Sequence, residues 1–194
     1  AHYLPDAIDS VLAQTMTDYE CLVVDDQSTD NTEEIVQRWA GDGVTYLRTP
    51  RNLKLSGARM YGAAHAKGTY IIFLDADDML TPNALDLLST ALDHSTDIHI
   101  AFGHLDTVSD DGSNRKRNPW PGDTFDWTAQ IAHLNQSNYA AMMRREVLEQ
   151  SGGYRTRDWR AEDASLWTRL TSFGFRAAKV TDESPLFYRL RSDS

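Results

Sequence analysis

The sequence is poor in cysteine and in positive charge, and it has no long apolar run. Cys21 is the only cysteine, so an internal disulfide and a cysteine-rich zinc site are excluded, and the six histidines show no zinc-type spacing. Lys and Arg total 19 against 29 Asp and Glu, a net charge of −10 that argues against binding to nucleic acid or to an anionic membrane. The strongest apolar run, residues 70–74, is far shorter than the roughly 20 residues that span a bilayer. Any metal would therefore use oxygen or histidine ligands, and no membrane segment is expected in this chain.

Strand and helix patterns alternate through the first half of the chain. This alternation is typical of an α/β fold with a mainly parallel central sheet flanked by helices, and 194 residues suffice for one domain over 1–194. In the first half we expect helices over 4–13, around 32–39, and over 56–66 and 83–92, and strands over 20–24, 44–47, 69–74 and 97–102, the last-but-one buried on both faces. In the second half we expect a loop or exposed hairpin over 106–122, strands over 139–143, 177–180 and 186–189, and a helix over 162–173.

Two aspartates, separated by Ala76, follow the apolar stretch 70–74 directly. Ligands of open α/β sheets bind outside the carboxyl ends of the strands, so Asp75 and Asp77 would lie where a substrate binds. Two carboxylates there can share a Mg²⁺ or Mn²⁺ ion that also takes phosphate oxygens of a substrate. The alternative is that these acids cap the next helix or belong to a turn, since their spacing is common.

A second acidic strand end occurs at Asp25 and Asp26. One of these carboxylates could accept hydrogen bonds from a base or a ribose, as in dinucleotide-binding sheets. The alternative is a turn with local side-chain caps. We expect the two acidic ends to converge on one sheet, and gathering so much negative charge in one cleft favours a cation.

Arg59 lies on a predicted helix lined with small residues, Ala58, Gly62 and Ala66. Its guanidinium could reach a phosphate, or it could form an ion pair with Asp25 or Asp75.

Asp163 stands in the first turn of the predicted helix over 162–173, on the same face as Leu166 and Trp167. The helix dipole favours its charge there, and a carboxylate kept ionised at the rim of a cleft suits a general base. Glu162 and Asp163 could equally be ordinary acids of a first turn.

Three stretches, in order, resemble the family-2 inverting glycosyltransferases of the GT-A (nucleotide-diphospho-sugar transferase) fold: residues 3–35, 51–78 and 151–170. The resemblance implies that Asp25 and Asp26 contact the nucleotide base and ribose, and that Arg59 lies near the nucleotide. It implies that Asp75, Ala76 and Asp77 form the DxD motif for donor and metal, with Asp77 and Asp75 as metal ligands. It identifies Glu162 and Asp163 as the ED motif, with Asp163 as the base. Gly152, Gly153, Tyr154, Glu162 and Trp167 would line the acceptor side.

The chain departs from the family pattern in four places. Lys54 stands where the family usually has Gly, and Met60 stands where Asn often follows the arginine, so the local loop shape and donor preference could differ. The Gln-x-x-Arg-Trp motif of processive members is absent, which favours transfer of a single sugar. The family also opens with a central strand that would precede Ala1, so we expect this chain to be a piece of a longer protein, with some nucleotide contacts outside it.

The resemblance thus implies a metal-dependent, inverting transfer of one sugar from a nucleotide-diphosphate sugar to an acceptor hydroxyl, in polysaccharide biosynthesis. The donor would be a UDP-sugar, uracil being the commoner base in the family, and the acceptor a carbohydrate or a lipid-linked one. The cofactor would be Mn²⁺ or Mg²⁺, and no nucleic acid would take part. Residues 1–105 would bind the donor and residues 106–194 the acceptor, in the cytoplasm or at the cytoplasmic face of a membrane.

Two alternatives stay open at this point. Asp75-Ala76-Asp77 after a buried strand is also similar to the nucleophile loop of haloacid-dehalogenase-like phosphohydrolases, although Met79 stands where that loop has Thr or Val. A catalytically silent module that binds a sugar or a nucleotide is the other.

Overall fold

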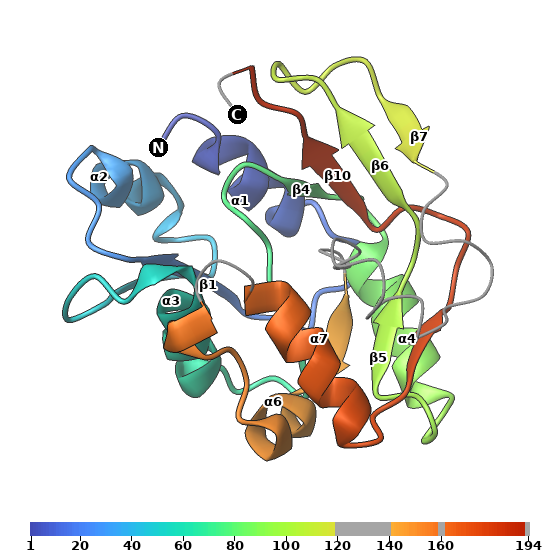
Figure 1. The fold of residues 1–194 in the computed structure, drawn as a ribbon. Helices are drawn as coiled ribbons and strands as arrows, with labels where there is room; N and C mark the ends of the chain where they lie inside the picture. The colour runs from blue at the N-terminus through green and yellow to red at the C-terminus, as the bar shows by residue number, and fades with distance from the viewer. Residues whose placement is uncertain (119–140, 159–161, 193–194) are drawn as a thin grey trace.

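The computed structural model describes residues 1–118, 141–158 and 162–192, which fold into helices packed on short strands (Figure 1). The helices are α1 (Leu4–Leu12), α2 (Thr32–Val36), α3 (Lys54–His65), α4 (Ala84–Asp93), α6 (Arg145–Ser151) and α7 (Glu162–Ser172), with 3₁₀ turns at Gln37–Trp39 and Thr156–Asp158. The strands are β1 (Cys21–Asp25), β2 (Val44–Arg48), β3 (Tyr70–Ile72), β4 (Met79–Leu80), β5 (Ile100–Phe102), β6 (Leu105–Val108), β7 (Lys116–Asn118), β8 (Met142–Arg144), β9 (Ala177–Lys179) and β10 (Leu186–Arg189).

The described strands form three hydrogen-bonded sheets, ordered β1-β2, β4-β10-β6-β7 and β3-β8-β5-β9. Three of their seven pairings are parallel and four are antiparallel, so the expectation of mainly parallel pairing is wrong here, although the α/β class is confirmed. The cause is that β8 and β10, from the second half, pair antiparallel with β3 and β4 from the first. Hydrophobic patterning marks a strand but does not identify its neighbour.

The sequence suggested that the two acidic strand ends lie on one sheet. In the described residues they belong to two different hydrogen-bonded sheets. β1 pairs with β2, whereas β3 pairs with β8. β3 is also shorter than expected, and only Ile71 in it is buried while Tyr70 and Ile72 are half-buried. The expected burial of this strand on both faces is therefore wrong.

Most of the other expected elements are confirmed within a few residues. The stretch from residue 106 forms a hairpin, in which β6 and β7 pair antiparallel. Its expected exposure is wrong for β6, because that strand also pairs with β10 and buries Asp106 and Val108. Residues 119–122 of that expectation, and 139–140 of the next strand, lie outside the described residues. Two short elements, β4 and α6, were not expected.

The sheet that holds β3, β8 and β5 lies between two helical layers. Ile100 and Phe102 of β5 pack toward α6 and α7, where Val147 and Leu166 are fully buried. Ala101, between them, faces the opposite side and packs against α4. Alternate residues of one strand thus fill two cores, as the period of a strand requires.

The pair β1-β2 is likewise covered on both sides. α1 and α2 bury Ile8 and Val36 against it. On the other side α3 approaches closely, since a Cβ added at Gly62 would lie 2.8 Å from the Val24 Cγ2. The absence of a side chain at Gly62 therefore lets α3 lie close to β1. Of the helices in 1–118, 141–158 and 162–192, none has the length and apolar character that crossing a membrane requires.

Candidate active site

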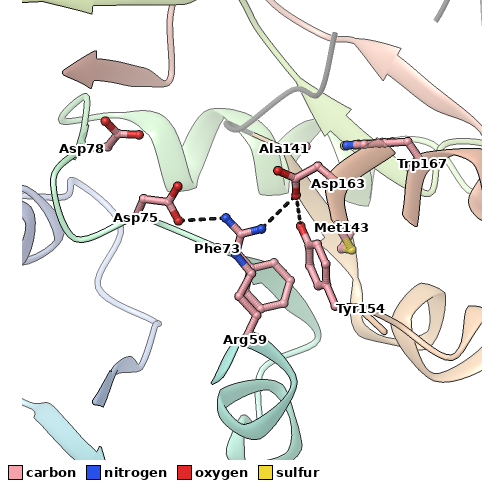
Figure 2. A pocket seen from close by; sticks show the side chains of 9 residues that line it. All are labelled: Arg59, Phe73, Asp75, Asp78, Ala141, Met143, Tyr154, Asp163 and Trp167. Carbon is pink, nitrogen blue, oxygen red and sulfur yellow. Dashed lines mark hydrogen bonds and ion pairs between the residues drawn. The ribbon is translucent and has the colours of Figure 1, made fainter. Parts of the chain in front are cut away.

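Arg59 joins the acidic turn after β3 to the first turn of α7 (Figure 2). Its Nη2 donates to Asp75 Oδ1 and its Nη1 to Asp163 Oδ1, each over 2.9 Å. Only 9% of its side chain is exposed. Burial by itself lowers the pKa of Arg59, but Tyr154, Asp75 and Asp163 outweigh it and raise that pKa above its ordinary value. The ion pair considered for Arg59 is thus present with Asp75, and with Asp163 as well.

Asp163 accepts a second hydrogen bond on the same oxygen. The Tyr154 hydroxyl donates to Asp163 Oδ1 over 2.9 Å, and the Arg59 guanidinium stacks on the Tyr154 ring at 4.9 Å from its centre. Burial, followed by the charge of Asp163, raises the pKa of Tyr154 well above its ordinary value. The hydroxyl therefore keeps its proton and remains a donor at any working pH.

These groups surround a small pocket, which Figure 2 shows. Arg59, Asp75, Tyr154, Asp163 and Trp167 are among the residues that line it, and its volume is about 20 Å³. That space holds about one water molecule. The pocket marks where carboxylates from both halves of the chain meet, and it is too small in this state to hold a sugar.

The acidic turn contains a third carboxylate that the sequence analysis did not single out. Asp78 is 2% exposed, and its Oδ1 accepts a 2.9 Å hydrogen bond from the backbone N–H of Arg189. Burial, and then repulsion from Asp75 and Asp77, raises the pKa of Asp78 to about 7, although the Arg189 N–H acts in the opposite direction.

Arg189 on β10 fastens this turn to the rest of the molecule. Its side chain donates to the Asp77 carbonyl oxygen at 2.8 Å, to the Asp110 carbonyl oxygen at 2.6 Å and to Asp6 Oδ2 at 2.7 Å. The sequence offered one signal of this contact, namely the arginine that ends the apolar strand Leu186–Arg189, because a buried charge needs partners.

The residues expected to hold a metal offer two carboxylates. Asp75 uses Oδ1 for Arg59, while Asp77 Oδ2 lies 3.4 Å from Arg191 Nη1, and both side chains are about one-third exposed. No group of three or more His, Cys, Asp or Glu side chains placed for a metal is found in the described parts of the chain. Two carboxylates fit Mg²⁺ or Mn²⁺ shared with substrate phosphates, and they do not form an all-protein cage.

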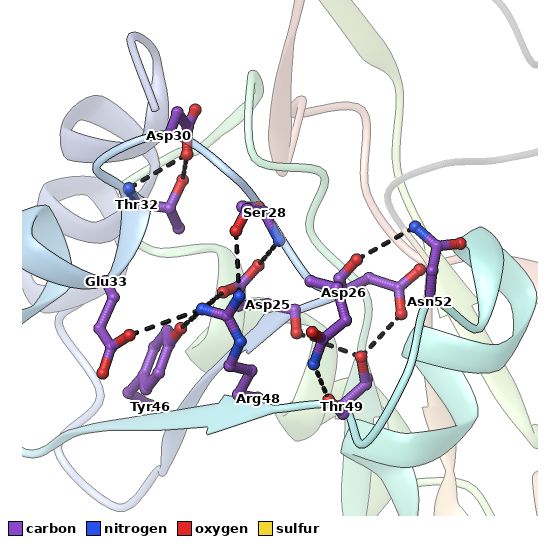
Figure 3. Close-up of polar contacts among 11 residues, drawn as sticks. Asp25, Asp26, Ser28, Asp30, Thr32, Glu33, Tyr46, Arg48, Thr49 and Asn52 are labelled. Atoms are coloured by element: carbon purple, nitrogen blue, oxygen red, sulfur yellow. Dashed lines mark hydrogen bonds and ion pairs between the residues drawn. The ribbon is translucent and has the colours of Figure 1, made fainter.

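Asp25 and Asp26 lie in different surroundings (Figure 3). Asp25 is buried, and its carboxylate accepts hydrogen bonds from Ser28 N–H at 2.8 Å, Tyr46 Oη at 2.5 Å and Arg48 Nη1 at 3.1 Å. Asp26 is half-buried, and its Oδ1 accepts from Thr49 Oγ1 at 2.8 Å and Leu53 N–H at 2.7 Å. Asp25 is therefore engaged within the protein, whereas Asp26 keeps one oxygen without a hydrogen-bond partner among the described residues.

The residues expected on the acceptor side are partly brought together. Tyr154 and Trp167 line the pocket with Asp163, but Glu162 does not. Gly152 and Gly153 have φ of +73° and +54°, and a Cβ added at Gly153 would collide with Met60 Sδ. Met60, one of the departures from the family pattern, thus packs directly against this turn.

Lys54, another departure from the family pattern, has φ of +62°. This is the left-handed region that glycine adopts most easily, which fits the glycine usual in the family at this position.

The chain matches a family of sequences over most of its length. Residues 1–152 match the model of "Glycosyl transferase family 2". The putative glycosyltransferase EpsE of Bacillus subtilis is 27% identical over 98% of this chain and 69% of its own length. UDP-Glc:alpha-D-GlcNAc-diphosphoundecaprenol beta-1,3-glucosyltransferase WfgD of Escherichia coli is 32% identical over 56% of this chain and 42% of its own.

Solved structures share the fold. TarS of S. aureus in complex with UDP-GlcNAc superposes with a TM-score of 0.81 at 18% identity, over 98% of this chain and 56% of that one. GalNAc-T7 with UDP, GalNAc and Mn²⁺ gives a TM-score of 0.75 at 20% identity, over 97% of this chain and 41% of that one. The chain therefore spans between two-fifths and seven-tenths of these proteins.

Proposed function

This chain belongs to glycosyl transferase family 2, and from that premise we propose that it transfers a single sugar, with inversion, from a nucleotide-diphosphate sugar to an acceptor hydroxyl. Asp163 takes the proton of the attacking hydroxyl. The observation that carries the proposal is the meeting of Asp163 with Asp75 and Arg59 around one pocket. The chemistry needs a base on the acceptor side and positive charge near the leaving group.

The chain's own residues divide this work between them. Asp163 is 14% exposed and offers Oδ2 toward an acceptor. Arg59 brings a permanent positive charge to the side of the departing diphosphate. Asp75 and Asp77 would hold a Mn²⁺ or Mg²⁺ ion, which when bound stabilises the charge of the leaving nucleoside diphosphate. General base catalysis of this kind contributes about 10²- to 10⁴-fold in rate.

The donor and the acceptor follow from the relatives. The WfgD name includes UDP-Glc and a diphosphoundecaprenol acceptor, and both structures were solved with UDP or a UDP-sugar. They support a UDP-sugar as the donor and a carbohydrate or lipid-linked acceptor in polysaccharide synthesis. We further propose that Asp26 contacts the base or ribose, that residues 1–105 bind the donor and 106–194 the acceptor, and that the reaction takes place in the cytoplasm or at the cytoplasmic face of a membrane.

Family membership argues against the haloacid-dehalogenase-like phosphohydrolase considered above. The other alternative, a catalytically silent binding module, is distinguished from a transferase by the experiment described next.

The test combines donor binding with turnover. We expect UDP to raise the melting temperature more in the presence of Mn²⁺ than without it, and GDP and dTDP to raise it less. Asp77→Ala should remove the part of the melting-temperature shift that depends on Mn²⁺. Asp163→Asn should keep the shift but reduce the release of UDP from UDP-GlcNAc or UDP-glucose, with sugar acceptors or water, by about 10²-fold or more.

Asp42→Asn, at an exposed loop position, is the matched control and should leave both readouts unchanged. Turnover of the Asp163→Asn protein within a few fold of wild type would contradict the role of the base. A nucleotide shift with no turnover in the wild type would favour the silent module.

A further inference from the structure

Tyr154 is an acceptor-side residue whose hydroxyl touches the proposed base. Its hydroxyl and the Arg59 Nη1 both bond Asp163 Oδ1 at 2.9 Å, while Asp163 Oδ2 has no hydrogen-bond partner in the described parts of the chain. A carboxylate has two oxygens that are equivalent until donors distinguish them. Two donors on one oxygen therefore leave the other as the only free proton acceptor.

The two donors reach Asp163 from different elements. Arg59 belongs to α3, and Tyr154 follows the Gly152-Gly153 turn, so together they oppose rotation of the carboxylate in two directions (Figure 2). The Tyr154 ring is held between the Arg59 guanidinium, at 4.9 Å, and Phe73, which it meets edge-on at 5.4 Å.

The turn that carries Tyr154 is itself fixed to α7. Arg169, on α7, donates to the Gly153 carbonyl oxygen and to the Ser165 carbonyl oxygen. On the other side, the Tyr154 N–H lies 3.3 Å from Met60 Sδ, on α3. Tyr154 and Asp163 are thus parts of one packed unit, in which the hydroxyl is aimed at the carboxylate.

We propose that Tyr154 is a positioning residue of the transfer reaction, whose hydroxyl, with Arg59, occupies Asp163 Oδ1 and so directs Oδ2 at the acceptor hydroxyl. This inference rests on the proposed function, and it gives Tyr154 a role through Asp163 in place of contact with the acceptor. The proton moves from the acceptor hydroxyl to Asp163 Oδ2 as the acceptor oxygen bonds the anomeric carbon of the sugar. The bond from that carbon to the diphosphate breaks in the same step, and its electron pair leaves with the nucleoside diphosphate. Tyr154 neither gains nor loses a proton.

The deciding variant is Tyr154→Phe, which keeps the ring contacts with Arg59 and Phe73 and removes only the hydroxyl. We expect kcat for UDP release from the donor sugar to fall about tenfold or more, the usual effect of losing a hydrogen bond to a charged group. The KM for the donor and the melting-temperature shift with UDP and Mn²⁺ should stay within twofold of the wild type. A crystal structure of the variant should show the Asp163 carboxylate turned away from its present orientation.

Tyr70→Phe is the matched control, because Tyr70 also donates its hydroxyl to an aspartate, Asp93, outside the pocket. It should leave kcat unchanged. An unchanged kcat in Tyr154→Phe, or an acceptor KM that rises at constant kcat, would overturn the proposal. An Asp163 orientation in the variant identical to that of the wild type would overturn it as well, and this readout does not depend on turnover. Failure of the proposed function would instead appear as a wild-type protein without turnover.

Discussion

Asp25 has a buried carboxylate that accepts several hydrogen bonds in the folded protein. Burial alone raises the pKa of Asp25, but hydrogen bonds from Ser28 and Tyr46 and the charge of Arg48 outweigh it and lower the pKa below its ordinary value. A carboxyl with a lowered pKa stabilises the fold above its unfolded pKa, about 4, and that stability is lost as the pH falls through its folded pKa. Asp25 thus links the end of β1 to β2 through charge.

We expect Tyr46→Phe to lower the free energy of unfolding by about 2 kcal/mol at pH 7, because it removes one donor from an ionised, buried group. The loss should become smaller at pH 3, where Asp25 is closer to being protonated. Urea denaturation at the two pH values measures both. Tyr61→Phe, whose hydroxyl has no hydrogen-bond partner in the described residues, should change neither. Equal losses for Tyr46→Phe at both pH values would contradict the linkage to Asp25.

At the scale of residues, the sequence identified the candidate site residues better than it identified their hydrogen-bond partners. Asp75, Arg59 and Asp163 were each selected from their positions on predicted elements, and the structure brings them within hydrogen-bond distance. The hydrogen bond from Tyr154 to Asp163, and the clamp on the acidic turn by Arg189, were not predicted. Periodicity places a side chain on a face but does not say which distant element meets that face.

Among the elements, α3 shows how small residues bring a helix close to a strand. Gly62 lies against Val24 of β1, and Arg59 stands three positions earlier on the same helix. The distance between α3 and β1 therefore also sets how far the Arg59 guanidinium can reach.

We expect Gly62→Ala to destabilise the protein by about 1 kcal/mol or more. Alanine gains about 1 kcal/mol in helix propensity, but its Cβ would lie 2.8 Å from Val24 Cγ2 on a stiff β-branched side chain, and overpacking costs about 1 to 3 kcal/mol. Chemical denaturation measures the difference. In a Val24→Ala background the same substitution should be neutral or stabilising. A stabilised Gly62→Ala protein with Val24 intact would mean that the helix moves away from the strand at little cost.

The elements that sequence reasoning missed or misjudged are those whose existence depends on a partner. β4 has two residues and is a strand only because it pairs with β10. The pairing of β8 with both β3 and β5 changes a predicted parallel sheet into a mixed one. Long amphipathic helices such as α4 were predicted correctly because their pattern is contained in their own residues.

At the scale of the whole molecule, the single thiol, that of Cys21, can be used to measure how often the folded structure opens around β1. Cys21 is 9% exposed, and burial raises its pKa to about 11. At pH 8 only about one molecule in a thousand would hold the reactive thiolate, and the reagent would also need access to the core.

We therefore expect a thiol reagent at pH 8 to label the native protein only as fast as the region around β1 opens, and to label one equivalent at once in guanidinium chloride. Absorbance of the released chromophore follows the reaction. Thr96→Cys adds an exposed thiol, which should react immediately in the native state. Rapid reaction of Cys21 in the native wild type would show that the β1 core is not closed.

The fastening of the acidic turn by Arg189 has a consequence for the order of events during synthesis. Asp78 and Arg189 are separated by 111 positions, so the ribosome makes the acid long before the strand that contacts it. Until β10 is added, the Asp78 carboxylate lacks the Arg189 backbone N–H that donates to it, and the Asp77 carbonyl oxygen lacks the Arg189 guanidinium. Contacts between residues so far apart in the sequence form slowly during folding. The acidic turn therefore reaches the geometry described above only after β10 has been synthesised and has docked against it.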